Sequence, residues 1–296
     1  MKKIIHVQRA PRPHWVGNGF RVHSLFFYEQ GADALSPFLM LDYGAPHTFA
    51  PGDEPRGVGQ HPHRGFETVT VAYQGEIEHR DSEGNRGVIG PGDVQWMTAA
   101  SGIVHEEWLS QGFNAQGGTV EMAQLWVNLP ARLKMSAPGY QEITAGQIPQ
   151  VVTEGGAKVR VIAGEFATGT GEHVRGPART LSPVNVWDAR LPAAAPLPLT
   201  LQPGYTTLLA VLHGDVRIGD HPSVVGPALA VLERDGNAVT LVAGAAGATV
   251  LILHGEPLNE PVAGHGPFVM NSRDQLIEAI QDFQRGTFIR ARAETA

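Results

Sequence analysis

Two short pairs, His61-Pro-His63 and His105-Glu-Glu107, hold the residue types in this sequence that are best suited to chemistry. Each pair places potential metal ligands at positions i and i+2, in a stretch whose composition predicts a strand. Alternate residues of a strand point to the same face of a sheet. We therefore expect His61 and His63 to face one cavity, and His105 and Glu107 to face it from a second strand. Three imidazoles and one carboxylate form a donor set that binds a transition metal ion.

A second carboxylate, Glu67, competes with Glu107 for the fourth ligand position, because it has the parity of His63. Sequence spacing does not decide between the two. Two other roles for Glu67 stay open. It could accept a hydrogen bond from a ligand imidazole, as such ligands usually require, or it could be a buried carboxylate paired with Arg64 or Arg80.

The alternation also predicts which side chains line the cavity beyond the first histidine pair. Continued along the chain, it places Val69 and Val71 on the cavity face, and Thr68 and Thr70 on the opposite face, towards solvent. We expect His79 at the surface, although the alternation places it on the same face as the apolar Ile77. The predicted cavity wall is thus apolar apart from the ligands.

These side chains must be positioned by strands, because strand-like runs dominate the chain. The 296 residues are comfortable for two domains. Several short strands separated by glycine and proline turns predict a sandwich or barrel. The clearest runs are residues 67–73, 158–164, 206–214, 238–244 and 248–255, with turns at 83–85 and 91–93.

The second half of the chain resembles the first in pattern. LLAVLHGDVRIG follows the same order as TVTVAYQGEIEH: an apolar strand, a glycine turn and a second strand. We infer two related β-domains, joined by a proline-containing linker within residues 130–150. No second H-x-H pair occurs after the linker, where His213 and His254 are isolated, so no second metal site is expected.

One helix is predicted near the C-terminus. Residues 272–275, Ser-Arg-Asp-Gln, form a capping box. Apolar residues follow at helical spacing, and Gly286 is a good C-terminal stop. The pattern predicts an amphipathic helix packed on a sheet through Leu276, Ile277, Ile280 and Phe283.

Composition excludes several classes of function. The net charge of −7, without a basic run, gives no electrostatic basis for nucleic-acid binding. The absence of cysteine excludes disulfides, thiolate metal sites and a cysteine nucleophile. No secretion signal or membrane helix is predicted, and a cytoplasmic location is the expectation.

Four stretches resemble the pirin family of the cupin superfamily. They are HPHRGFETVTVAYQGEIEHRDSEGNRG, GPGDVQWMTAASGIVHEEW, QLWVNLPARLKMSAPGYQ at 124–141 and GEPLNEPVAGHGPFVMNS at 255–272. The resemblance implies an all-β bicupin, that is, two stacked antiparallel β-barrel (jelly-roll) domains with a short C-terminal helix. The expected domains are residues 1–140, which bind the metal, and residues 141–296, which do not and which end in the helix.

Carried over residue by residue, the family's metal ligands fall on His61, His63, His105 and Glu107. The resemblance, rather than the spacing, thus favours Glu107 over Glu67. The expected cofactor is one divalent transition metal ion. Fe(II) is the leading choice, and Mn, Co, Ni, Cu and Zn are alternatives because the donor set alone does not select among them.

The resemblance further implies an activity, because some pirins act as flavonol 2,3-dioxygenases on quercetin. The expected substrates are a flavonol and O₂, with Glu107 as both a metal ligand and the base that takes the 3-hydroxyl proton. The alternative is a non-enzymatic, redox-responsive metal-binding regulator that acts through a protein partner.

Overall fold

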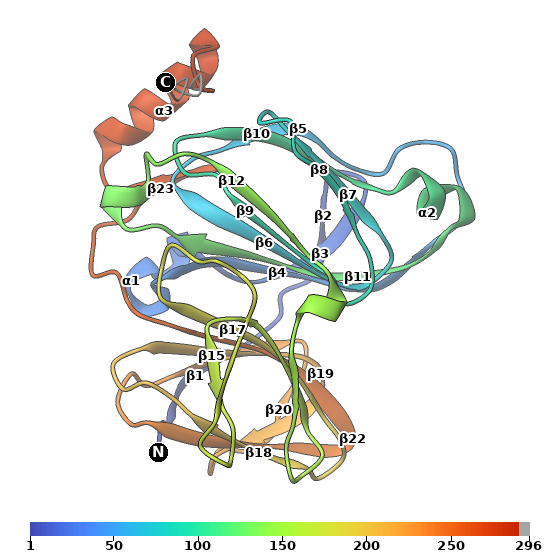
Figure 1. Ribbon diagram of the computed structural model, residues 1–296, viewed down its shortest axis with the longest axis vertical. Helices are drawn as coiled ribbons and strands as arrows, with labels where there is room; N and C mark the ends of the chain where they lie inside the picture. Colours follow the sequence, from blue (N-terminus) through green and yellow to red (C-terminus); the bar gives the residue numbers. More distant parts are fainter. Residues whose placement is uncertain (290–296) are drawn as a thin grey trace.

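The computed structural model describes residues 1–289, and strands form most of its regular structure (Figure 1). In the first half, two antiparallel sheets form a jelly-roll sandwich. The larger sheet has the strand order β12-β9-β6-β11-β4-β3-β2, and the smaller has the order β5-β10-β7-β8. The strands are β2 (His14–Val16), β3 (Phe20–Phe27), β4 (Phe38–Phe49), β5 (Gly57–His63), β6 (Phe66–Gln74), β7 (Ile77–Asp81), β8 (Arg86–Ile89), β9 (Val94–Thr98), β10 (Ile103–Leu109), β11 (Gly118–Asn128) and β12 (Gly139–Ile143).

The second half is built on a sheet with the order β1-β21-β19-β22-β17-β14-β13, to which β18 and β20 add at the side. A small hairpin of β15 and β16 lies beside it. The strands are β1 (Ile4–Arg9), β13 (Gln150–Val152), β14 (Lys158–Ala163), β15 (Glu165–Ala167), β16 (His173–Arg175), β17 (Val184–Leu191), β18 (Pro196–Thr200), β19 (Thr206–Ile218), β20 (Val224–Val225), β21 (Ala228–Leu232) and β22 (Ala238–Gly255).

Helices are few and short within the described residues. They are η1 (Tyr28–Gln30), α1 (Ala32–Leu35), α2 (Gln111–Gln116), η2 (Ala131–Leu133), η3 (Ala145–Gln147) and α3 (Arg273–Arg285). None of the helices within residues 1–289 combines the length and the apolar character that crossing a bilayer requires.

The all-β bicupin prediction is confirmed, with one change: the sheets of the two halves are not closed into barrels. The halves stack end to end, with β2–β12 in the upper part of Figure 1 and β13–β22 in the lower part. The core of the second half is filled with apolar side chains, among them Trp187, Leu209, Leu241 and Ile252. The described interior of the second half is therefore largely apolar.

Each end of the chain packs on the half to which it does not belong in sequence. Strand β1, at the N-terminus, pairs with β21 in the second half. The hairpin of β23 (Ala263–His265) and β24 (Phe268–Met270) lies with α3 on the first half, at the top of Figure 1. The predicted division at residue 140 stays a prediction, and residues 290–296 of its second part lie outside the described residues.

Three local predictions differ from the structure. The expected linker at 130–150 contains β12, which pairs with β9 of the first half. The runs 238–244 and 248–255 form one strand, β22. The capping box and the Gly286 stop of α3 are confirmed, but Ile277 and Phe283 are each 44% exposed, because Leu276 and Ala279 form the buried side of the helix.

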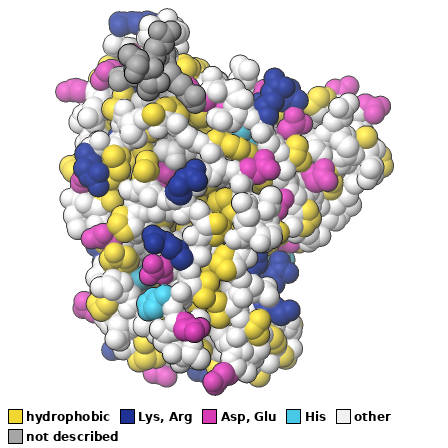
Figure 2. Space-filling model, in the orientation of Figure 1, with side chains coloured by type: hydrophobic (Ala, Val, Ile, Leu, Met, Phe, Trp, Pro, Cys, Tyr) yellow, Lys and Arg dark blue, Asp and Glu magenta, His cyan; other side chains and the backbone are white. Residues whose placement is uncertain are grey.

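The face in Figure 2 shows how charge is distributed. Lysine and arginine side chains are interspersed there with aspartate and glutamate. No basic patch of the kind that binds nucleic acid gathers on this face.

Candidate metal centre

Two neighbouring strands of the smaller sheet position the two pairs. Strand β10 alternates strictly between buried and half-buried residues, so that His105 and Glu107 point inward. Strand β5 runs antiparallel beside it, and His61 lies directly opposite His105. The parity predicted within each pair therefore holds. The register of β5 on β10 brings the two pairs together, which spacing within the sequence could not predict.

The three imidazoles meet at one point. The ring centroids of His61 and His105 are 4.3 Å apart, those of His61 and His63 are 4.8 Å apart, and those of His63 and His105 are 4.9 Å apart. One ring nitrogen from each lies within 4.8 Å of those of the others. This is the spacing of side chains that can share one ion.

The state of the rings suits metal binding. Burial lowers the pKa of His63 and of His105 well below the ordinary value, and the neighbouring imidazoles lower both further. Neutral imidazole is the form that binds metals. The His61 Nδ1 donates to the carbonyl of Gly59 at 2.8 Å, which leaves its Nε2 free. His105 Nε2 is buried without a hydrogen-bond partner, as expected of an atom that awaits an ion.

The carboxylate of Glu107 is held beside these rings by three donors. Its Oε1 accepts hydrogen bonds from Gln95 Nε2 at 3.1 Å and from Thr70 Oγ1 at 3.2 Å. Its Oε2 accepts one from Gln124 Nε2 at 3.4 Å. Glu107 is 4% exposed, so the donors fix the direction of a nearly dry carboxylate that can serve as an oxygen ligand.

His79 is not at the surface, and the prediction that placed it there is wrong. It is fully buried, its Nε2 donates to Asp81 Oδ2 at 3.1 Å, and its ring stacks on Tyr140 with centroids 4.7 Å apart. Its Nδ1 lies 3.4 Å from His105 Nδ1. Because a carboxylate only accepts, His79 carries its proton on Nε2, and its Nδ1 accepts from His105.

His79 thus supplies the hydrogen bond that a ligand imidazole needs from its second nitrogen. A ligand-orienting role of this kind was one of those left open for Glu67. The sequence did contain a signal for the burial of His79: it has the same parity as the apolar Ile77, and both residues are buried on β7. His79, His105 and Glu107 also have ligand atoms within 4.8 Å of one another.

Glu67 lies on the other side of the sheet from the candidate ligands. It is fully buried, and its Oε1 accepts a hydrogen bond from Thr98 Oγ1 at 2.7 Å. Neither predicted ion pair forms, since Arg64 pairs with Asp282 and Arg80 pairs with Glu78. Burial raises the pKa of Glu67 to about 7, and the hydrogen bond from Thr98 opposes that rise.

The predicted cavity face of β6 is also wrong. Val69 and Val71 pack in a core shared with the second half of the chain. Thr68 and Thr70 are fully buried rather than exposed, and Thr70 bonds Glu107. The prediction assumed one unbroken strand through Gly65. At Gly65, however, the chain passes from the smaller sheet to the larger one, so the alternation does not continue.

Gly65 makes that turn possible. Its φ is +93°, a region that favours glycine, and a Cβ atom there would lie 2.0 Å from the carbonyl oxygen of Val269. The Gly65 carbonyl accepts a hydrogen bond from the buried Lys134 at 2.7 Å. The loop after His63 is therefore fixed by close contact with the C-terminal hairpin.

Three of the four candidate ligands line a cavity of about 320 Å³ in the first half. His61, His63 and Glu107 form one side of it. The rest of the wall is mainly apolar, from Phe20, Val22, Met40, Val58, Met122 and Trp126. The volume is within the range of small-molecule sites.

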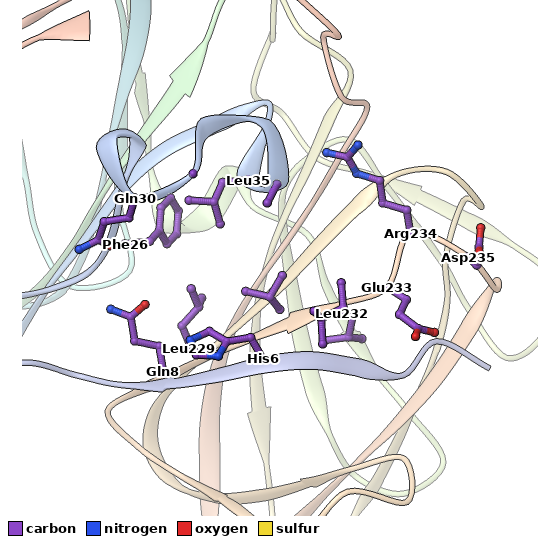
Figure 3. Close-up of a pocket in the computed structure, with 14 residues that line it drawn as sticks. His6, Gln8, Phe26, Gln30, Leu35, Leu229, Leu232, Glu233, Arg234 and Asp235 are labelled. Carbon is purple, nitrogen blue, oxygen red and sulfur yellow. The ribbon is translucent and has the colours of Figure 1, made fainter.

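A larger cavity, of about 550 Å³, lies between the halves but is remote from this chemistry (Figure 3). Phe26 and Leu35 line it on one side, and His6 and Leu229 line it on the opposite side. Within residues 1–289, the clusters of potential metal ligands are the two around His105, so the larger cavity is not the candidate centre.

Comparisons with known proteins identify the family of this chain. The family model described as Pirin matches residues 19–127, and that of the Pirin C-terminal cupin domain matches residues 186–289. A Pseudomonas aeruginosa protein named "Putative quercetin 2,3-dioxygenase" is 51% identical over 98% of this chain and 100% of its own length.

Two further relatives extend the comparison. The crystal structure of a quercetin 2,3-dioxygenase from Acinetobacter baumannii has a TM-score of 0.93 and 49% identity, over 97% of this chain and 98% of that one. Mouse pirin is 38% identical over 84% of this chain and 82% of its own length.

Proposed function

The chain belongs to the pirin family of cupin proteins, and we propose that it is a metal-dependent dioxygenase that opens flavonols of the quercetin type. The observation that carries the proposal is the cluster of three imidazoles, which shares His105 with the neighbouring cluster that contains Glu107, beside a mainly apolar cavity. The likeness to the Acinetobacter quercetin 2,3-dioxygenase, over nearly the full length of both chains, supports the choice of reaction.

In this proposal, His61, His63, His105 and Glu107 hold one divalent metal ion, with Fe(II) the leading choice. Nitrogen and oxygen donors without sulfur suit Fe, Mn, Co, Ni, Cu and Zn alike. When bound, the ion would supply Lewis acidity and a template for substrate oxygens.

The protein's own groups bind and orient the flavonol. The faces of Trp126 and Phe20 pack on its rings and exclude water. Glu107 takes the proton of the 3-hydroxyl group, because its carboxylate lines the cavity together with His61 and His63. The hydrogen bonds from Gln95, Thr70 and Gln124 keep that carboxylate in place.

The first test is metal analysis of the purified protein, followed by aerobic assays with quercetin. The expected result is about one equivalent of metal per chain, with oxygen consumption and release of carbon monoxide. Fully metallated protein that converts no flavonol would remove the dioxygenase proposal and would favour the redox-responsive regulator.

Variants test the ligand assignment. His63→Ala and His105→Ala each remove one imidazole from a shared ion, so we expect both metal content and turnover to be lost. The matched control is His254→Asn, because His254 is also a buried histidine but lies in the second half, where it contacts Thr207. Unchanged metal content in both ligand variants would contradict the assignment.

A further inference from the structure

A row of polar side chains crosses the larger sheet of the first half, and two of its members, Asp42 and Gln124, line the cavity. Residues at matching register positions on five adjacent strands of the larger sheet form it, in the order Ser24 on β3, Asp42 on β4, Gln124 on β11, Thr70 on β6 and Gln95 on β9. One end of the row, at Thr70 and Gln95, donates hydrogen bonds to Glu107. The other end, at Asp42, has no link to the candidate metal ligands.

The two ends are separated by the width of two strand spacings. Thr70 and Asp42 both lie opposite Gln124, one on each side of β11. Strands pair at about 4.8 Å, so the two positions are roughly 10 Å apart across the sheet. A planar aromatic molecule bound at the Glu107 end would extend over the row towards Asp42.

Asp42 is a buried acceptor with spare capacity. It lines the cavity, and only 8% of it is exposed. Its Oδ1 accepts a hydrogen bond from Ser24 Oγ at 2.5 Å, and no residue within 1–289 donates to its Oδ2. Burial raises the pKa of Asp42, and the bond from Ser24 opposes that rise only in part. The Oδ2 atom is not among the fully buried side-chain atoms that lack a partner, so it is open to a donor that enters the cavity.

We infer that Asp42 is a specificity-determining residue, which accepts a hydrogen bond from a phenolic hydroxyl group on a flavonol ring remote from the metal-binding end. The inference rests on the proposed function and adds to it a preference for polyhydroxylated substrates. A flavonol without such a hydroxyl group would leave the carboxylate buried and unpaired, and sites built this way reject the analogue that lacks the group.

The test compares two flavonols that share the chelating 3-hydroxyl and carbonyl groups. Quercetin carries hydroxyl groups on both outer rings, whereas 3-hydroxyflavone carries none there. Their binding to the metal-loaded protein is measured by calorimetry without oxygen, so that no turnover occurs. We expect the wild-type protein to prefer quercetin, and Asp42→Leu to lower that preference by roughly 10-fold or more, the effect of one hydrogen bond to a charged group.

Two variants complete the design. Asp42→Asn keeps the shape of the side chain, and its carbonyl can still accept from Ser24. It then presents an N–H group to the cavity, so the preference for quercetin falls here too, even if Asp42→Leu does not fold. Met40→Leu changes an apolar position of the same strand and cavity, so it should alter the affinities of the two flavonols by the same factor.

The outcomes separate this inference from the proposed function. If Asp42→Leu and Asp42→Asn weaken both flavonols equally, or if neither flavonol binds the wild-type protein, the inference is overturned. If the preference behaves as expected while quercetin is never converted in air, the dioxygenase proposal fails and the assignment of Asp42 stands.

Discussion

Burial is the largest cause of the shifted pKa values of several ionisable residues in the first half. His63 and His105 are kept neutral in this way, which favours metal binding. The same effect raises the pKa of Glu67 to about 7 and lowers that of Lys134 to about 7. Glu67 has no cationic partner among the described residues to offset its burial. Its ionisation should therefore oppose folding.

Glu67 gives a prediction about pH. The folded state raises its pKa from 4.5 to about 7, so the folded protein binds the extra proton between these values. The contribution of Glu67 to the free energy of unfolding is therefore most favourable below about pH 4.5 and is lost as the pH rises towards 7. A shift of this size corresponds to roughly 3 kcal/mol. Glu67→Gln keeps the acceptor for Thr98 and carries no charge, so its stability should exceed that of the wild type by about that amount at pH 8.

Urea unfolding of the metal-free proteins at a series of pH values measures the difference. The titration of the histidines is common to both proteins and cancels in it. Glu278→Gln, on the exposed side of α3, is the control and should show no such trend. Equal stability of wild type and Glu67→Gln at pH 8 would show that Glu67 ionises without cost.

At the scale of elements, the C-terminal hairpin and helix hold the loop that follows the first histidine pair. Arg64, which directly follows His63, is 1% exposed and pairs with Asp282 of α3 at 2.8 Å. Its guanidinium group lies 4.3 Å from the centroid of the Phe288 ring. Its carbonyl accepts from the N–H of Val269 at 3.0 Å. Residues more than 200 positions away in the sequence thus fix the loop beside the candidate centre.

Asp282→Asn tests whether the ion pair between Arg64 and Asp282 fixes this loop. Removal of the charge leaves the Arg64 guanidinium buried without a carboxylate, and breaking such a pair costs about 3 kcal/mol or more. We expect a loss of stability of that order in chemical unfolding, with a weaker affinity for metal. Asp274→Asn, in the exposed first turn of the same helix, should cost less than about 1 kcal/mol. Equal losses of stability in Asp282→Asn and Asp274→Asn would show that the ion pair with Arg64 does not fix the loop.

Gly65→Ala tests the turn itself. The new Cβ would lie 2.0 Å from the carbonyl oxygen of Val269, so the backbone must move, and we expect a loss of more than about 4 kcal/mol together with loss of metal binding. Gly84 is the matched control, because its φ of +82° is similar but no atom lies within 4 Å of the added Cβ.

For Gly84→Ala we expect only the backbone strain, about 1–2 kcal/mol, and full metal content. Thermal unfolding and metal analysis of both variants check the pair of predictions. Normal metal content in Gly65→Ala would show that the contact with Val269 does not fix the ligand loop.

At the scale of the whole molecule, one apolar core joins the two halves. Leu41, Val69 and Leu125 from the first half share it with Val186 and Leu251 from the second. Polar contacts reinforce the junction, including the 2.5 Å contact between His213 Nε2 and Glu121 Oε1. Strand β1 and helix α3 also connect the two halves, because each packs on the half to which it does not belong in sequence. The halves should therefore not be independent in stability.

This shared core predicts one cooperative transition. We expect a single calorimetric peak for the metal-free protein, with equal calorimetric and van't Hoff enthalpies. Leu251→Ala should lower the whole transition by roughly 2–5 kcal/mol, because it opens a space in the common core. Two separate peaks, of which only one responds to Leu251→Ala, would show that the halves unfold independently.

Much of the architecture follows from local pattern. Runs such as 67–73 and 206–214 alternate or are continuously apolar, with glycine at their ends, and both form strands. The helix is marked by its capping box and its glycine stop. These signals are short-range, because backbone propensity and turn chemistry act within a few residues. The pairing of β1 with the second half has no such signal, because it depends on contacts across most of the chain.

The sequence by itself determined that the members of a candidate pair share a face, since i, i+2 spacing on a strand sends His105 and Glu107 to one side whatever lies around them. Only the tertiary structure decided that β6 turns its threonines, not its valines, towards the cavity, because Gly65 breaks the alternation between two sheets. It also decided the burial of His79 and the alignment of Asp42 with Gln124 and Thr70. Parity is local to one strand, whereas register and burial arise only when distant strands pair.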